Sequence, residues 1–347
     1  MPSVRLQPRE PAAYHAHVRV GTRTCTAIAL VLICLSAVAA QEPAFRAGDD
    51  LVLVPVSVTD QSGQFVHGLT SRDFEISEDG VPRAVKQLTT ERVPVSLAIL
   101  LDIGGSMPQN PQERLAEDAR WSDTRGALAW LFTRLGTRDE VSFAVFNDQV
   151  SASPWTQEYG SVLGTFDLLR PGGGSALLKA VKQIGLVFQT ARHHRKVLLL
   201  ITDGSDTQTP VGDGLPSLPY EIGSRIENTM GESRQRLLRD IAIQESRNAV
   251  RTNDAVLYAV GIGTRSGVPV DINLLDGLTK ESGGYTEPLR NPWEIAVAVA
   301  RIWDDLQSQY LLTFGPGHND GKYHPIRVRT KDSRLKVRTR AGYVAVR

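Results

Sequence analysis

The sequence predicts an α/β fold with a doubly wound, mainly parallel sheet, preceded by a small β unit and followed by a β extension. Two observations support this prediction. Four strand candidates, three of them nearly continuous in apolar residues, alternate with helical stretches: residues 95–101, 141–146, 196–202 and 255–261. The chain on either side of this region instead alternates apolar and polar residues, as strands with one solvent face do.

The first 40 residues have the layout of a secretory signal peptide. Arg19 and Arg23 precede the apolar run TAIALVLICLSAVAA, whose small final residues fit a cleavage site near Ala39 or Ala40. The run is short for a membrane span, and an uncleaved anchor is the alternative. Both cysteines of the chain lie here, so the mature chain would have no disulfide. We expect a secreted, periplasmic or cell-envelope protein whose only membrane contact would be an uncleaved signal segment.

Residues 41–92 are predicted to be a linker and a small β unit. Apolar and polar residues alternate there, and turn signals occur at residues 61–63 and 78–80. The chain returns to strands in residues 309–347, with a turn at residues 319–321. We therefore expect a C-terminal β extension in addition to the N-terminal β unit.

Residues 93–308 are predicted to form the α/β domain, with helices between the strands. Asn291 and Pro292 provide an N-cap and a first residue for its last helix. The stretch 209–233 is rich in Gly, Pro and Ser, so we interpret it as a long insertion before a helix at about residues 234–251. Apolar residues recur at helical spacing in two earlier segments: Leu128, Leu131, Phe132 and Leu135, then Leu177, Ala180, Val181, Ile184, Val187 and Phe188.

Polar residues occupy the places where an open α/β sheet binds its ligands, beyond the carboxyl ends of the strands. Asp102 and Ser106 follow the first strand, Ser175 follows three glycines and opens a helix, and Asp203 ends a very apolar strand. Helix capping would explain each aspartate alone. Together, two carboxylates and two hydroxyls, with neither Cys nor His, are the ligands of a hard divalent cation such as Mg²⁺, Mn²⁺ or Ca²⁺.

These clusters, in this order on this pattern, resemble the von Willebrand factor A-type (VWFA) domain and its metal-ion-dependent adhesion site, which implies a Rossmann-like sheet. Asp102 and Ser106 match the ends of the D-x-S-x-S motif, Ser175 falls where a Thr belongs in a GGTAL-like segment, and Asp203 in TDG matches the last position. The segments VSVTDQSG, QSQYLLTF and LKVRTRAGYVA further resemble a secreted VWFA-related subgroup of acidobacteria and similar bacteria. The resemblance covers about residues 50–347.

The resemblance implies a protein-binding, adhesion-type module. In this family the hydroxyls bind the ion directly, the carboxylates bind it largely through water, and an acidic residue of the protein partner completes the coordination. Gly104 stands where the motif has its first serine, so one direct ligand is missing and the implied site is partly degenerate. The alternative is a metal-independent structural or scaffolding component of a bacterial envelope assembly.

Charge and motif content argue against other classes of function. Lys and Arg number 39 against 38 Asp and Glu, so no net field favours a nucleic acid partner. The segment GGGSALLK lacks the Gly-Lys-Ser/Thr of a phosphate-binding loop, and the chain has no G-x-S-x-G elbow. His193 and His194 are predicted to lie in a loop before a strand, and Asp206 is explained by turn chemistry. We therefore do not expect an enzyme.

Overall fold

The computed structural model describes residues 51–105, 111–207, 220–263 and 270–346, without the side chains of residues 111–119 and 220–235. The predicted signal segment, residues 1–40, lies outside the described residues. Within the described ranges, no helix combines the length and the apolar composition that a membrane span requires.

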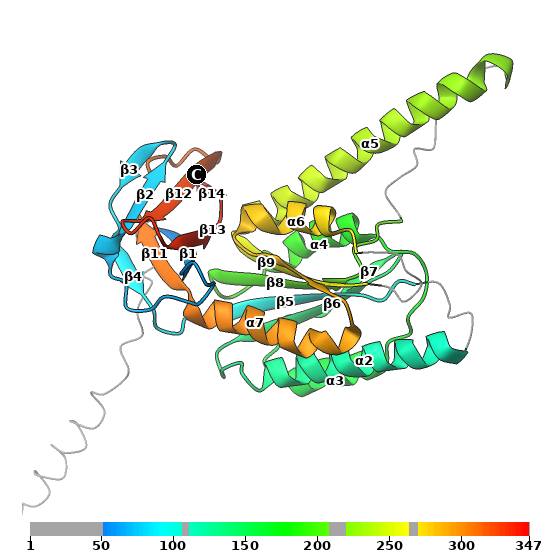
Figure 1. Cartoon of the computed structure of the whole chain (residues 1–347), viewed down its shortest axis with the longest axis horizontal. Helices are drawn as coiled ribbons and strands as arrows, with labels where there is room; N and C mark the ends of the chain where they lie inside the picture. Colours follow the sequence, from blue (N-terminus) through cyan, green and yellow to red (C-terminus); the bar gives the residue numbers. More distant parts are fainter. Residues whose placement is uncertain (1–50, 106–110, 208–219, 264–269, 347) are drawn as a thin grey trace, which may run out of the picture. The chain divides into compact units, whose positions relative to one another are not determined.

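The central sheet has six strands in the order β10-β9-β8-β5-β6-β7 (Figure 1). Strand β7 runs antiparallel to β6, and the other pairings are parallel. Every residue of β5 and β9, and every residue of β8 except Lys196, is buried because helices cover both faces. The predicted α/β fold class is confirmed. The strands are β5 (Val95–Asp102), β6 (Glu140–Phe146), β7 (Val150–Ala152), β8 (Arg195–Thr202), β9 (Ala255–Ile262) and β10 (Thr286–Leu289).

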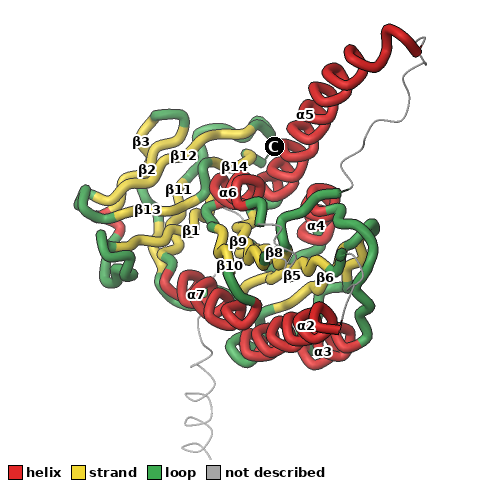
Figure 2. Tube along the Cα trace, turned by 45° about the vertical axis from the view of Figure 1, so that its right-hand side comes forward, coloured by secondary structure: helices red, strands yellow, loops and turns green. Residues whose placement is uncertain are grey.

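Six helices of the described chain cover this sheet (Figure 2). One face packs against α2 (Pro111–Phe132), α3 (Tyr159–Asp167) and α7 (Ile295–Ser308). The other face packs against α4 (Leu177–Phe188), α5 (Tyr220–Thr252) and α6 (Ile272–Thr279). Alternate side chains of β5 enter the two cores, because neighbouring residues of a strand point to opposite faces. Short 3-10 helices are η1 (Ser71–Asp73), η2 (Lys280–Ser282) and η3 (Pro292–Glu294).

Helix α5 corrects one prediction. It begins at Tyr220, so the irregular insertion predicted through residue 233 is wrong from residue 220 onward. The prolines of that stretch, the last of them Pro219, all precede the helix. The two glycines inside it, Gly223 and Gly231, each cost a helix only about 1 kcal/mol, so they do not end it.

Strands from both sides of the α/β region form a second, antiparallel β unit. Its two sheets have the orders β13-β1-β11-β4 and β14-β12-β2-β3. Their apolar faces form one shared core that includes Val54, Phe74 and Phe314. The predicted N-terminal unit and C-terminal extension thus pair with each other. The strands are β1 (Val52–Thr59), β2 (Phe74–Glu78), β3 (Val81–Arg83), β4 (Gln87–Thr89), β11 (Tyr310–Phe314), β12 (Tyr323–Thr330), β13 (Lys336–Thr339) and β14 (Gly342–Val344).

Candidate metal centre at the carboxyl edge of the sheet

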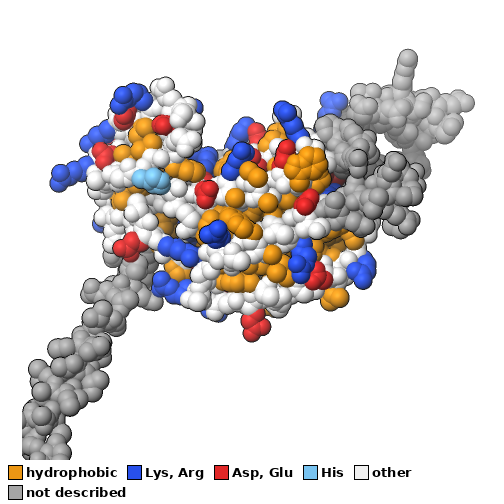
Figure 3. Space-filling model, turned by 60° about the horizontal axis from the view of Figure 1, so that its bottom comes forward, with side chains coloured by type: hydrophobic (Ala, Val, Ile, Leu, Met, Phe, Trp, Pro, Cys, Tyr) orange, Lys and Arg blue, Asp and Glu red, His pale blue; other side chains and the backbone are white. Residues whose placement is uncertain are grey.

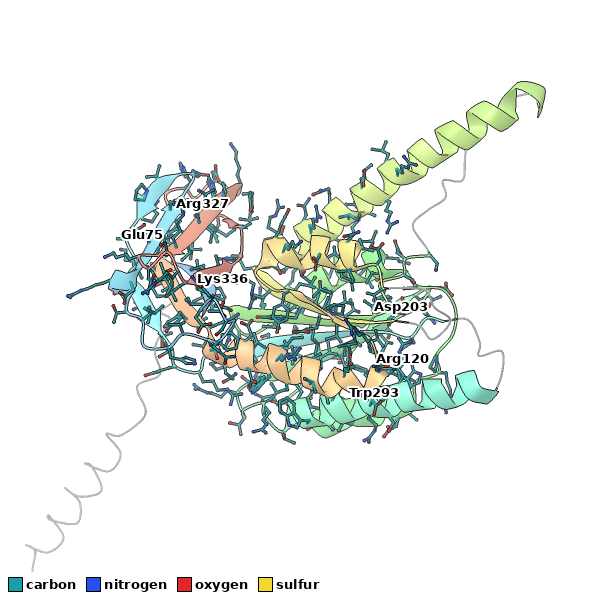
Figure 4. The ribbon with its side chains drawn as sticks, in the orientation of Figure 1. Glu75, Arg120, Asp203, Trp293, Arg327 and Lys336 are labelled. Carbon is teal, nitrogen blue, oxygen red and sulfur yellow. The ribbon has the colours of Figure 1, made fainter. Side chains whose placement is uncertain are left out.

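The structure places three of the four predicted ligands at one edge of the central sheet. Asp102 is the last residue of β5, Asp203 directly follows β8, and Ser175 lies just before α4. Strand β5 lies between β6 and β8, so the chain connections diverge here, as they do at ligand sites of open α/β sheets. Figure 4 shows Asp203 at this edge, with Arg120 of α2 on the same side of the molecule. The fourth predicted ligand, Ser106, lies outside the described residues.

The Asp102 carboxylate is buried, with 2% of the residue exposed. Its Oδ2 accepts hydrogen bonds from Thr202 Oγ1 at 2.7 Å and from Ser175 Oγ at 3.1 Å. Its Oδ1 accepts a hydrogen bond from the Gly104 backbone N–H at 2.9 Å. Burial raises the pKa of Asp102 to about 6, and the negative charge of Asp203 contributes, although the Thr202 hydrogen bond opposes the rise. Among the described residues, no basic side chain forms an ion pair with this carboxylate.

The Ser175 hydroxyl is positioned by hydrogen bonds of its own backbone. Its N–H donates to Thr207 Oγ1 at 2.8 Å, and the Thr207 N–H donates to its carbonyl oxygen at 2.8 Å. The hydroxyl faces two acceptors, the Ser205 carbonyl oxygen at 2.8 Å and Asp102, but it has only one proton. In the described part of the chain, no group donates a hydrogen bond to the Ser175 hydroxyl oxygen. Its lone pairs are therefore available to a metal ion.

Sequence reasoning missed Thr202, the last residue of β8. Its hydroxyl donates to Asp102 and accepts a hydrogen bond from the Gly204 N–H at 3.0 Å, which shapes the turn that carries Asp203. Asp203 Oδ1 in turn accepts from the Ser205 N–H at 2.8 Å. The available signal was a hydroxyl residue next to Asp203 at the end of an otherwise aliphatic strand.

Gly104 is required by the contact between two glycine-rich loops. A Cβ atom at this position would overlap the carbonyl oxygen of Gly174. The loops are also joined by hydrogen bonds from the Gly105 N–H to the Gly173 carbonyl oxygen at 3.1 Å and from the Gly172 N–H to the Ile103 carbonyl oxygen at 2.8 Å. The position of the missing motif serine is therefore filled by a backbone oxygen, not by empty space.

In the described part of the site, the hydrogen-bond partners of the Ser175 hydroxyl are oxygen atoms, and none is a basic side chain. His193 and His194 lie before β8, as predicted, and thus at the amino end of the strand whose carboxyl end precedes Asp203. They cannot activate Ser175 from there, because a general base must lie within hydrogen-bond reach of the hydroxyl. Figure 3 shows acidic and basic side chains interspersed on the face in view, in agreement with the balanced charge of the sequence.

Comparisons with solved structures gave low sequence identities. A von Willebrand factor type A protein from Catenulispora acidiphila is 14% identical, covering 87% of this chain and 76% of that one, with a TM-score of 0.44. The vWF domain of the type V pili tip protein Mfa5 from Porphyromonas gingivalis is 14% identical, covering 61% of this chain and 94% of that one, with a TM-score of 0.43. Proximal thread matrix protein 1 from the mussel byssus, with a zinc occupied MIDAS motif, is 12% identical, covering 61% of this chain and 48% of that one, with a TM-score of 0.39.

A search of curated protein sequences gave no match. The family model for the von Willebrand factor type A domain matches residues 97–205. That segment contains Asp102, Ser175 and Asp203. The chain therefore includes a region that matches the von Willebrand factor type A domain, the family that its sequence motifs resemble.

Proposed function

We propose that this chain is a secreted or cell-envelope module that binds a protein partner through a hard divalent cation, Mg²⁺, Mn²⁺ or Ca²⁺, at the carboxyl edge of its sheet. The observation that carries the proposal is the buried Asp102 carboxylate, which accepts hydrogen bonds from neutral groups and lies near a second acid, Asp203. Burial raises the pKa of Asp102 and the charge of Arg120 opposes that rise, but among the described residues no basic side chain forms an ion pair with this carboxylate. A buried charge of this kind is costly unless a cation compensates it.

The oxygen atoms at this edge fit such an ion. Asp102, Ser175 and Asp203 supply carboxylate and hydroxyl oxygens, and Ser106 adds a hydroxyl in the resembled motif. The Gly174 carbonyl oxygen, next to Gly104, is a further candidate, because hard cations also accept backbone carbonyls. It would partly replace the missing serine. The bound ion would supply the positive charge that attracts an acidic residue of the partner.

The proposed place of action follows from the first 40 residues. The basic residues, the short apolar run and the small residues at its end are typical of a secretory signal peptide. We propose export to the envelope or beyond, as in the secreted VWFA-related bacterial subgroup that the terminal segments resemble. In this role the domain recognises a protein and performs no catalysis.

Calorimetric titration of the chain with Mg²⁺ and Mn²⁺ tests the proposal. We expect one saturable site in the wild-type chain and loss of that site in Asp203→Ala, while Asp240→Ala, which removes an exposed carboxylate of α5, binds as the wild type does. Affinity capture from the native envelope, with and without EDTA, should recover the partner only when the metal is present. Absence of binding at millimolar Mg²⁺ and Mn²⁺, or capture unaffected by EDTA, would favour the metal-independent structural role instead.

A further inference from the structure

A second group of possible metal ligands lies in the β unit, apart from the carboxyl-edge site. It consists of Asp79, His318 and His324, and we call it the histidine cluster. Asp79 lies in the turn between β2 and β3, His318 in the connection between β11 and β12, and His324 in β12. One ligand atom of each residue lies within 4.8 Å of those of the other two.

The two imidazole rings are stacked, with centroids 4.8 Å apart and planes inclined by 6°. His324 Nδ1 lies 2.7 Å from Asp79 Oδ2, and His318 Nε2 lies 3.9 Å from the same oxygen. The other ring nitrogen of His324, Nε2, lies 3.0 Å from Asp320 Oδ1. A carboxylate on the far nitrogen of a histidine is the usual support for a metal-binding imidazole, because it fixes the ring and makes the near nitrogen more basic.

The backbone holds these side chains together. Asp79 and Gly80 form a two-residue hairpin turn, with φ of 51° and 80°, and the Asp79 N–H donates to the Pro325 carbonyl oxygen at 3.0 Å. The connection that carries His318 is tied to β2 because the Gly317 N–H donates to Glu78 Oε2 at 2.8 Å. The three ligands therefore come from segments whose positions are fixed by hydrogen bonds other than their own side-chain contacts.

The charges around the cluster favour a cation. Asp79 and Asp320 supply two carboxylates, and Lys322 Nζ is 4.0 Å from Asp320 Oδ2. Arg83 of β3 forms an ion pair with Glu78 at 2.7 Å. Without a metal, the His324 ring lies between these two acids, 2.7 Å from Asp79 and 3.0 Å from Asp320, and Lys322 lies beside Asp320. A divalent ion would take the place of a proton on Nδ1.

We propose that the histidine cluster binds a borderline divalent transition-metal ion such as Zn²⁺ through Asp79 Oδ2, His318 Nε2 and His324 Nδ1, with Asp320 orienting His324. Mixed imidazole and carboxylate ligands favour this class of ion over Mg²⁺ or Ca²⁺. Ligand atoms about 2.0–2.2 Å from one zinc ion lie about 3.3 Å apart, so Asp79 must move away from His324 by roughly half an ångström. Asp79 is on an exposed turn and can make this adjustment. The lone pair of a ring nitrogen lies in the ring plane, so the exposed His318 ring must also turn out of its stack with His324 to direct Nε2 at the same ion.

The test uses the full chain without a polyhistidine tag, dialysed against EDTA. Zn²⁺ is titrated in competition with a chromogenic chelator, and Co²⁺ replaces Zn²⁺ for visible absorption. We expect one site, at least about tenfold weaker in Asp320→Asn, the residue that only orients a ligand, and weaker still in His318→Gln and Asp79→Asn. The asparagine in Asp79→Asn keeps a side chain that tolerates the positive φ of the turn.

Two controls separate this proposal from the proposed function. His194→Gln removes an exposed histidine elsewhere and should bind Zn²⁺ as the wild type does. Asp203→Ala should lose the ion at the carboxyl edge of the sheet and should still bind Zn²⁺ at the histidine cluster. The proposal is overturned if the chain binds no Zn²⁺ or Co²⁺ at micromolar concentration, or if His318→Gln binds them with unchanged affinity while its circular dichroism shows an intact fold.

Discussion

Two buried aspartates, Asp102 at the carboxyl edge of the sheet and Asp305 in α7, differ in how their charge is compensated. Asp305 is fully buried, forms an ion pair with Arg338 of β13, and accepts a hydrogen bond from the Tyr258 hydroxyl at 2.6 Å. Asp102 is nearly as buried, but its described hydrogen-bond donors are all neutral. The fold therefore supplies a cation to the aspartate that joins its two regions. Among the described residues it gives the aspartate at the sheet edge no ion pair, although the charge of Arg120 in α2 opposes the rise in the pKa of Asp102 that burial causes.

The largest expected effect comes from removing the internal cation. Arg338→Met leaves Asp305 buried without its partner, and we expect the free energy of unfolding to fall by about 3–5 kcal/mol. Urea denaturation followed by circular dichroism measures this change. The double variant Arg338→Met/Asp305→Asn is the matched control and should recover much of the loss, whereas equal losses in the single and double variants would show that packing, not charge, is responsible.

The opposite sign is expected at Asp102. Asp102→Asn removes a carboxylate whose pKa is raised to about 6, so in EDTA at pH 7 the variant should be more stable than the wild type by about 2–3 kcal/mol. Below about pH 3 the wild-type carboxyl is protonated in both folded and unfolded chains, so the stability difference should vanish. The difference should grow as the pH rises from about 3 to about 6. Denaturation at about pH 3 and about pH 7 checks this, and a variant less stable at both values would contradict it.

A smaller effect is expected at Gly104. Gly104→Ser restores the motif residue, but its Cβ overlaps the Gly174 carbonyl oxygen, so we expect a loss of about 1–3 kcal/mol and no gain in Mg²⁺ affinity. Gly126→Ser is the control, because a Cβ there meets no atom within 4 Å. Tighter Mg²⁺ binding by Gly104→Ser at unchanged stability would show that Gly104 merely lacks a metal ligand and is not required for the close contact of the two loops.

The sequence predicted most of the central sheet, because its strands are apolar runs with clear polar ends. The predicted strand 95–101 and the observed β5 differ by one residue. The pairing of β1 with β11 and β13 could not be predicted, since it joins segments about 250 to 280 residues apart and depends on which apolar faces meet. Helix α5 was underestimated because its first turns have few apolar residues to mark a period.

The candidate site was predictable in its residue types and less so in its contacts. Asp102 and Ser175 do meet at the sheet edge, as their places at strand and helix ends indicated. The role of Thr202 depends on the direction of one hydroxyl, and the role of Gly104 on the close approach of a loop about 70 residues away. Neither feature has a periodic or compositional signal in the chain.

The most direct test of the central claim is thermal unfolding of the wild type and of Asp102→Asn, each with saturating Mg²⁺ and with EDTA. Both chains carry His318→Gln so that the histidine cluster does not contribute. A ligand that binds only the folded state raises the melting temperature, so Mg²⁺ should stabilise the chain with Asp102 and leave the Asp102→Asn chain unchanged. Equal responses of the two chains, or no response in either, would contradict a metal site at Asp102.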